Sequence, residues 1–115
     1  MVSSQDYPYL KVRLALRSYQ TEVLAYIDTG FDGYLIAPVD VTQVLGKPDY
    51  ISRWELGDGS LTEGQDYLGS VRIIGLPDNI EAHITAIGNE FIIGRAVIDQ
   101  YRVILDHGRR VDVER

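Results

Sequence analysis

The sequence predicts a mainly β protein with one short helix near its C-terminus. Most apolar residues lie in runs of strand length, and several runs alternate with polar residues, as half-buried strands do. Turn-forming glycine, proline and aspartate residues separate these runs. A chain of 115 residues buries one modest core. We therefore expect a single domain over residues 1–115, with a core at about 9–106 and a charged tail at 107–115.

The composition argues against several classes of function. Eleven basic and seventeen acidic residues give a formal net charge of −6, and such a protein repels the phosphates of nucleic acids. Cysteine is absent, so the chain has no disulfide framework and no thiolate nucleophile. The two histidines, His83 and His107, are far apart in the sequence, and we expect no metal site and no cofactor. No apolar run approaches the length of a membrane span, so we expect a soluble, cytoplasmic protein that binds no membrane.

The first two strands are expected to form a hairpin. Residues 9–17 alternate from Leu10 onward, with leucine and valine on one face and lysine and arginine on the other. A short turn follows, and residues 21–27 return as a more apolar strand. The hairpin therefore delivers Asp28 to the end of its second arm.

A short strand and a short helix are expected next. Residues 34–37 form an apolar run that ends at Pro38, which cannot donate to a sheet. Residues 40–45 are predicted to be helical, with Asp40 as the N-cap and Gly46 as the terminator.

The strongest hairpin signal in the chain is the Asp58-Gly59 turn. Apolar positions lie on both sides of it within residues 54–62. Further strands are expected over residues 67–74, 80–87 and 102–106, with a short helix over 95–101 and a weak strand over 111–114.

An apolar strand runs directly into an acidic turn at Asp28. The preceding residues, 25–27, would carry the backbone into the interior, where an ionisable group is hard to keep solvated. Gly30 and Gly33 allow a tight turn, and Thr29 supplies a hydroxyl able to tie this turn to a neighbouring segment. We expect Asp28 to carry the chemistry of the protein. The alternative is an ordinary turn aspartate that caps its own loop.

A matching feature lies in the second half of the chain, where an apolar run ends at Gly94 and Arg95 follows at once. Together, the Asp-Thr-Gly triplet at 28–30 and the Ile-Ile-Gly-Arg run at 92–95 resemble the retropepsin-like aspartic proteases, which include the retroviral proteases. The likeness covers about residues 9–106. An isolated Asp-Thr-Gly arises by chance in short chains, whereas the two motifs in this order and in apolar surroundings are much more specific.

The resemblance implies a retropepsin-like acid protease barrel that acts as an aspartic endopeptidase. The chain has one Asp-Thr-Gly and no room for a second lobe, so a second identical subunit must complete the site. The Asp28 carboxylates of the two subunits would activate a water that hydrolyses a peptide bond. The catalytic turn would comprise Asp28, Thr29 and Gly30, and the loop beneath it would be supported by Ile92, Ile93, Gly94 and Arg95. The expected partners are therefore a second copy of the chain and a peptide or protein substrate.

The same resemblance places a flap over the site and substrate contacts around it. The residues that would bind the substrate are Asp32, Gly33, Gly57, Asp58, Gly59 and Ser60, of which the last four form the flap tip. Asp32 would pair with Arg95; the alternative is that both are solvated surface charges. Part of the dimer interface would lie in the paired termini, so that removal of residues 106–115 should weaken association more than it disturbs the strands.

Two residues depart from the retroviral pattern. Phe31 stands where the retroviral proteases carry alanine, and a bulky ring there would alter the shape of the pocket. Asp58 adds negative charge to the flap tip, which would favour basic substrates or a different use of the flap.

Two other functions are compatible with the same residues. The first is a non-catalytic dimeric module that binds peptides or dimerises on the same fold, because a fold does not fix a function. The second is a generic β-barrel binding domain unrelated to proteases. The intact Asp-Thr-Gly and the glycine at 94 argue against the second.

Overall fold

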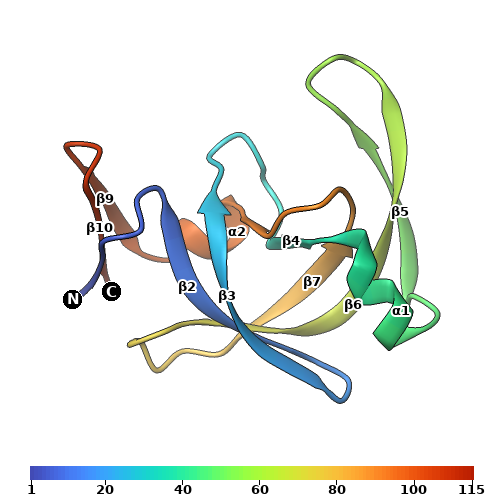
Figure 1. Ribbon diagram of the computed structural model, residues 1–115, viewed down its shortest axis with the longest axis horizontal. Helices are drawn as coiled ribbons and strands as arrows, with labels where there is room; N and C mark the ends of the chain where they lie inside the picture. Colours follow the sequence, from blue (N-terminus) through green and yellow to red (C-terminus); the bar gives the residue numbers. More distant parts are fainter.

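A seven-stranded sheet and a three-stranded sheet make up most of the molecule (Figure 1). The computed structural model describes residues 1–115. The strands are β1 (Val2–Ser4), β2 (Tyr9–Leu16), β3 (Tyr19–Ile27), β4 (Leu35–Ala37), β5 (Tyr50–Glu55), β6 (Leu61–Ile73), β7 (Ile80–Ala86), β8 (Ile92–Ile93), β9 (Arg102–Asp106) and β10 (Arg110–Glu114). The helical elements are the 3-10 turn η1 (Val39–Val41) and the helices α1 (Thr42–Leu45) and α2 (Arg95–Ile98). The predicted mainly β class is confirmed.

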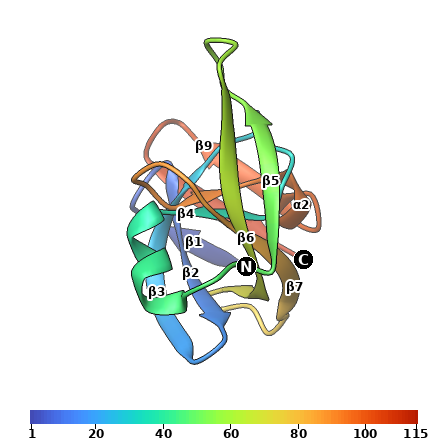
Figure 2. The same cartoon turned by 90° about the vertical axis from the view of Figure 1, so that its right-hand side faces the viewer.

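The larger sheet closes into a barrel. Its strands run in the order β2-β3-β8-β4-β7-β6-β5, and β2 also pairs with β6. The short strand β8 is parallel to β3 and antiparallel to β4, and β4 is parallel to β7. Strand β5 lies outside the closed ring and pairs only with β6. The β5–β6 hairpin therefore projects from the body of the barrel (Figure 2).

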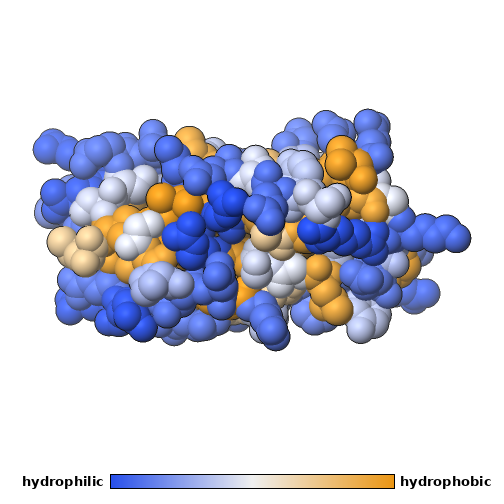
Figure 3. All heavy atoms as spheres, turned by 90° about the horizontal axis from the view of Figure 1, so that it is seen from below, coloured by the Kyte–Doolittle hydropathy of each residue, from blue (hydrophilic) through white to orange (hydrophobic).

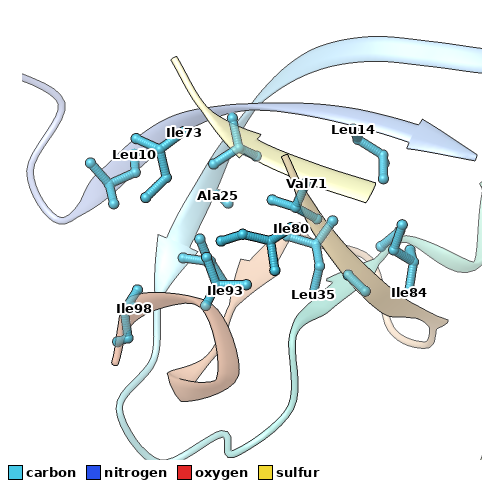
Figure 4. Close-up of a cluster of buried hydrophobic side chains, with 14 of the residues drawn as sticks. Leu10, Leu14, Ala25, Leu35, Val71, Ile73, Ile80, Ile84, Ile93 and Ile98 are labelled. Carbon is cyan, nitrogen blue, oxygen red and sulfur yellow. The ribbon is translucent and has the colours of Figure 1, made fainter. Parts of the chain in front are cut away.

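The inner face of the barrel follows from the alternation of β2. Its four core residues are at most 2% exposed: Leu10, Val12, Leu14 and Leu16. Figure 4 shows that β3, β4, β6, β7, β8 and α2 point apolar side chains at the same centre. Because both β3 and β8 end against this core, the residues that follow them are fixed at the edge of the barrel.

Strand β6 is longer than the sequence indicates. Residues 61–66 pair with β5, residues 65–71 with β7, and residues 70–73 with β2. We expected the hairpin arm and a strand over 67–74 to be separate, and they are one strand of 13 residues. Gly64 and Gly69 lie within this strand, where a Cβ would be 2.5 Å from Thr85 Cγ2 and 2.5 Å from the Ala15 carbonyl oxygen respectively, so close approach of neighbouring strands requires glycine at both positions.

The termini form a sheet of their own within one chain. β10 lies between β1 and β9 and is antiparallel to both. Val111 and Val113 are 0% exposed, so the C-terminal strand is part of the core rather than a free tail. The strand expected over 111–114 is confirmed as β10, whereas β1 was not predicted, because it is only three residues long.

The helical stretch expected over residues 40–45 is confirmed as η1 and α1, whereas the C-terminal helix is shorter than expected and one capping prediction is wrong. Asp40 does not cap the helix that follows it; Pro38 occupies the N-cap of η1, and no side chain caps either element. Gly46 ends α1 with φ of 78°, as predicted. α2 ends at Ile98, and the residues expected to continue it form turns with hydrogen bonds of the i to i−3 type.

Polar and charged side chains cover much of the lower surface, where apolar side chains form separate patches (Figure 3). None of the helices has the length and the apolar content needed to span a membrane.

Candidate active site

The two motifs of the sequence lie side by side at the edge of the barrel. Parallel pairing aligns Tyr26 with Ile92 and Ile27 with Ile93. One residue further on, the Asp28 amide donates to the Ile93 carbonyl at 3.1 Å. Asp28 therefore begins its loop directly against the Ile-Ile-Gly-Arg segment, which confirms that the structure brings the two motifs together.

The first amides of α2 hold the Asp28 loop from behind. The Arg95 amide donates to the Phe31 carbonyl at 2.8 Å, and the Ala96 amide donates to the Gly33 carbonyl at 3.0 Å. A Cβ at Gly94 would overlap both the Gly33 carbonyl oxygen and the Phe31 ring. Only glycine therefore lets the loop approach α2 closely enough for these bonds.

Asp28 is half-buried and lines a cleft. Its Oδ1 accepts the Gly30 amide at 2.8 Å, and the Phe31 amide donates to the Asp28 carbonyl at 3.2 Å. The second carboxylate oxygen, Oδ2, forms no hydrogen bond within the chain. One oxygen of Asp28 is thus held by the loop and the other is free to meet a ligand.

Thr29 does not tie the turn to another segment of the same chain, contrary to expectation. Its side chain is exposed and forms no hydrogen bond within the chain. The loop is held by backbone amides instead, which the sequence pattern does not reveal.

A cleft of about 750 Å³ lies between the Asp28 loop, the part of the β5–β6 hairpin next to its turn (residues 54–57 and 62) and the segment around residues 87–92. The predicted site residues that line it are Asp28, Gly30, Asp32, Gly57, Ile92 and Arg95. The remaining predicted residues lie outside it: Thr29, Gly33, Ile93 and Gly94 belong to the loop and its support, and Asp58, Gly59 and Ser60 form the hairpin tip. Several further residues line the cleft that were not predicted from the sequence, including Trp54, Glu55 and Glu90.

Phe31 is largely buried and forms part of the wall of the cleft. It is 7% exposed, and its ring occupies the space next to Gly33, where a Cβ would lie 2.5 Å from Cζ. The ring centroids of Phe31 and Trp54 are 5.4 Å apart with a tilt of 57°. This aromatic pair joins the Asp28 loop to strand β5 and forms one wall of the cleft.

The expected pairing of Asp32 with Arg95 is wrong within the single chain. Both side chains are exposed and line the same cleft, but no ion pair joins them. The backbone amide of Arg95 already holds the loop, so its guanidinium group is not needed for that purpose and remains available to the cleft.

Asp58 organises the tip of the hairpin. Its carboxylate accepts the Ser60 hydroxyl at 2.6 Å and the Ser60 amide at 2.9 Å, and these bonds lower the pKa of Asp58. Gly59 has φ of 86°, a conformation that favours glycine. The predicted Asp-Gly turn is thereby confirmed, and Asp58 remains charged at the tip.

The cleft has an acidic lining. Asp28, Asp32, Glu55 and Glu90 face it together with one basic residue, Arg95. Glu90 accepts the Tyr9 hydroxyl at 2.9 Å, and this hydrogen bond raises the pKa of Tyr9. A ligand with positive charge would meet a favourable field here.

Comparisons with known proteins find matches at the level of structure. No protein-family model and no curated protein matches the sequence. A retropepsin-like aspartic protease from Rickettsia conorii superposes with a TM-score of 0.61 at 15% identity, over 96% of this chain and 97% of that one. The simian foamy virus protease superposes with a TM-score of 0.56 at 14% identity, over 79% of this chain and 91% of that one. The barrel, the crossing of β8 between β3 and β4, and these two likenesses show that the chain has the retropepsin-like fold.

Proposed function

We propose that the protein is an aspartic endopeptidase that works as a homodimer. The observation that carries this proposal is the placement of Asp28: one carboxylate oxygen is held by the Gly30 amide and the other is free at a cleft. Both structural neighbours are proteases of the aspartic or retroviral kind by name. Asp28, Thr29 and Gly30 are the catalytic turn, and Gly94 and Arg95 support it.

A second copy of the chain supplies the second carboxylate. Hydrolysis of a peptide bond by carboxylates needs one group to accept a proton and another to donate one. No hydrogen bond or ion pair joins Asp28 to another acidic residue of its own chain. The exposed hydroxyl of Thr29 lies beside Asp28 and is likewise without a partner. Two copies related by a two-fold axis would bring two such turns together.

The two Asp28 carboxylates share one proton in this arrangement, because two like charges so close cannot both ionise. The ionised member accepts a proton from a water, whose oxygen attacks the carbonyl carbon of the substrate. The protonated member donates its proton to the carbonyl oxygen. The carboxyl group that took the proton from water then donates it to the amide nitrogen, while the other carboxylate takes a proton from a hydroxyl of the tetrahedral intermediate. The bond between carbon and nitrogen breaks, and the pair is again singly protonated. The symmetric subunits can exchange these roles.

The β5–β6 hairpin acts as the flap over the bound peptide. Gly57 lines the cleft, and the tip of Asp58, Gly59 and Ser60 lies beyond it. The free carboxylates of Asp32 and Glu55 favour peptides with basic side chains next to the scissile bond.

The substitution Asp28→Asn tests the proposal. The amide keeps the shape of the carboxyl group, so the fold and the dimer should persist while hydrolysis of a peptide pool is lost. The wild-type rate, measured from about pH 3 to about pH 8, should be bell-shaped, because only the singly protonated pair is active. Sedimentation at micromolar concentration should give about twice the chain mass.

Two results would contradict the proposal. One is equal hydrolysis by wild type and Asp28→Asn. The other is a well-folded wild-type dimer that cleaves no peptide of the pool, which would favour the non-catalytic binding module on the same fold.

A further inference from the structure

A chain of hydrogen bonds lies under the β5–β6 hairpin where it joins the barrel. The Trp54 indole nitrogen donates to the Ser52 hydroxyl at 2.7 Å, and the Ser52 hydroxyl donates to Asp66 Oδ1 at 2.9 Å. The Thr85 hydroxyl donates to the same Oδ1 at 2.7 Å. These four residues, which we call the Trp54 network, come from strands β5, β6 and β7.

The Trp54 network is anchored in the interior. Asp66 is 8% exposed and Thr85 is 3% exposed. Each donor has an acceptor, since the Ser52 hydroxyl accepts the indole proton and passes its own proton to Asp66. Hydrogen bonds to a buried carboxylate are among the stronger ones in proteins, so this end of the network is rigid.

Gly64 gives the network its space. It lies opposite Ser52 in the β5–β6 register. A Cβ at this position would be 2.5 Å from Thr85 Cγ2 and 3.0 Å from the Trp54 indole nitrogen. The indole can therefore lie across β6 only because residue 64 has no side chain.

The same indole ring of Trp54 also contacts the proposed catalytic loop. It packs against Phe31, which lies three residues after Asp28, and both rings line the cleft. One side chain thus links the buried carboxylate of Asp66 on one side with the Asp28 loop on the other.

We propose that Trp54 is a positioning residue that sets the height of the hairpin over the Asp28 loop, and that Ser52, Asp66 and Thr85 hold its indole in place. For catalysis this rests on the function proposed above. The consequence is specific: the network acts on how the hairpin covers a substrate, whereas the carboxylates that do the chemistry are untouched. Loss of the network should raise KM and leave kcat and its pH profile nearly unchanged.

The state of the Trp54 indole can be followed directly by spectroscopy. Trp54 is the one tryptophan in the chain, so the indole N–H signal in NMR and the tryptophan fluorescence report on it alone. Ser52→Ala removes the acceptor of the indole proton, and Thr85→Val removes one donor to Asp66. Ser70→Ala and Thr21→Val are matched controls, because both residues lie in strands of the same barrel and neither side chain forms a hydrogen bond.

Hydrogen exchange of the Trp54 indole and NMR relaxation of the hairpin amides should be measured for wild type and these variants, followed by peptide hydrolysis. In Ser52→Ala we expect the indole to exchange about tenfold faster and KM to rise about three- to tenfold, with a smaller effect in Thr85→Val. The hairpin amides should become more mobile in both. The two controls should match wild type in every measurement, and Trp54→Phe, which keeps a ring but loses the N–H, should raise KM as Ser52→Ala does.

The failure of this inference can be told apart from the failure of the proposed function. Unchanged indole exchange and unchanged hairpin mobility in Ser52→Ala would overturn the positioning role whether or not the protein cleaves peptides. An indole that is released while KM stays constant would also overturn it. If wild type cleaves no peptide, the enzymatic proposal falls, and the exchange and relaxation measurements still decide whether the network positions the hairpin.

Discussion

Gly94 is the single residue on which the meeting of the two motifs depends. Its missing side chain leaves room for the Gly33 carbonyl and the Phe31 ring, which a Cβ would overlap. The carbonyl oxygens of Phe31 and Gly33 would both lie within 3.0 Å of that Cβ, and these backbone atoms cannot rotate away as a side chain can. The geometry of Asp28 is therefore set partly by a residue with no functional group.

Gly94→Ala should destabilise the protein by on the order of 2 to 3 kcal/mol, because the added methyl group forces the loop away from α2. Activity should fall further than stability, since the same loop carries Asp28. Urea unfolding and peptide hydrolysis would measure the two effects. Gly57→Ala is the matched control for the unfolding measurement alone, because Gly57 lines the cleft. It has open space at its Cβ position, and the change in the free energy of unfolding should stay within about 0.5 kcal/mol.

Arg95→Ala should cost less than about 1 kcal/mol, because its side chain is exposed and unpaired while its backbone amide, which holds the loop, is retained. A pair with Asp32, as expected from the sequence, would cost more to break if it were buried, because its loss would leave an uncompensated charge. The measurement is urea unfolding, with Asp32→Asn as the companion variant. A loss of several kcal/mol would show that the guanidinium group has a structural partner after all.

At the scale of elements, β10 is the central strand of the terminal sheet. It pairs with β1 on one side and β9 on the other, and its two valines are fully buried. β10 is therefore needed for the fold of its own chain, whether or not it also contacts a second copy.

Deletion of residues 111–115 should therefore unfold the terminal sheet and destabilise the whole chain, contrary to the expectation that removal of the C-terminus acts mainly on association. Each buried valine contributes about 1.5 to 3 kcal/mol, and β1 and β9 lose their only partner. Thermal unfolding of the truncated chain would show this, with deletion of Arg115 alone as the control. A truncated chain that keeps its melting temperature and only dissociates would restore the earlier expectation.

At the scale of the whole molecule, ionisable groups in several parts of the fold, some exposed and some buried, set the pH range of stability. The pKa of Asp49 is lowered mainly by the Leu68 amide, that of Asp58 by Ser60 and that of Asp106 by His107. A group whose pKa is lowered in the folded state stabilises the protein at pH values above its pKa in the unfolded state. This contribution is lost as the pH falls through its pKa in the folded state. The pKa values of Tyr67 and Tyr101 are raised mainly by burial. The effect of these tyrosines on stability has the opposite pH dependence: their contribution is lost as the pH rises.

Urea unfolding over a pH series should therefore show a plateau that declines below about pH 4 and above about pH 10. Asp49→Asn should flatten part of the acid decline, because the amide cannot titrate. The control is Lys47→Gln. Lys47 lies two residues before Asp49 and does not titrate at acid pH, so this change should leave the acid limb unchanged. An acid limb identical in wild type and Asp49→Asn would contradict the assignment. The fraction of protein that is unfolded at each pH also has to be measured when the rate of peptide hydrolysis is followed at acid pH.

The sequence predicts well what depends on neighbours along the chain. The alternation of β2, the Asp-Gly turn at residues 58–59 and the stop at Gly46 are local patterns, and the structure confirms them. The Trp54 network and the aromatic pair with Phe31 were not predicted, because their members come from different strands and meet only through the register of β5, β6 and β7. The pairing of β1 with β10 was missed for the same reason: it joins the two ends of the chain.

The length of β6 has a mechanical consequence. One continuous strand forms an arm of the hairpin, a wall of the barrel and the seam that closes the barrel against β2. The hairpin consequently has no separate hinge at its base, and any movement of its tip bends or twists a strand whose other end lies in the core. The stiffness of the hairpin therefore depends on the packing of the barrel. Substitutions of the buried residues Val71 or Ile73 should change the mobility of the hairpin over the cleft, although both lie far from its tip along the strand.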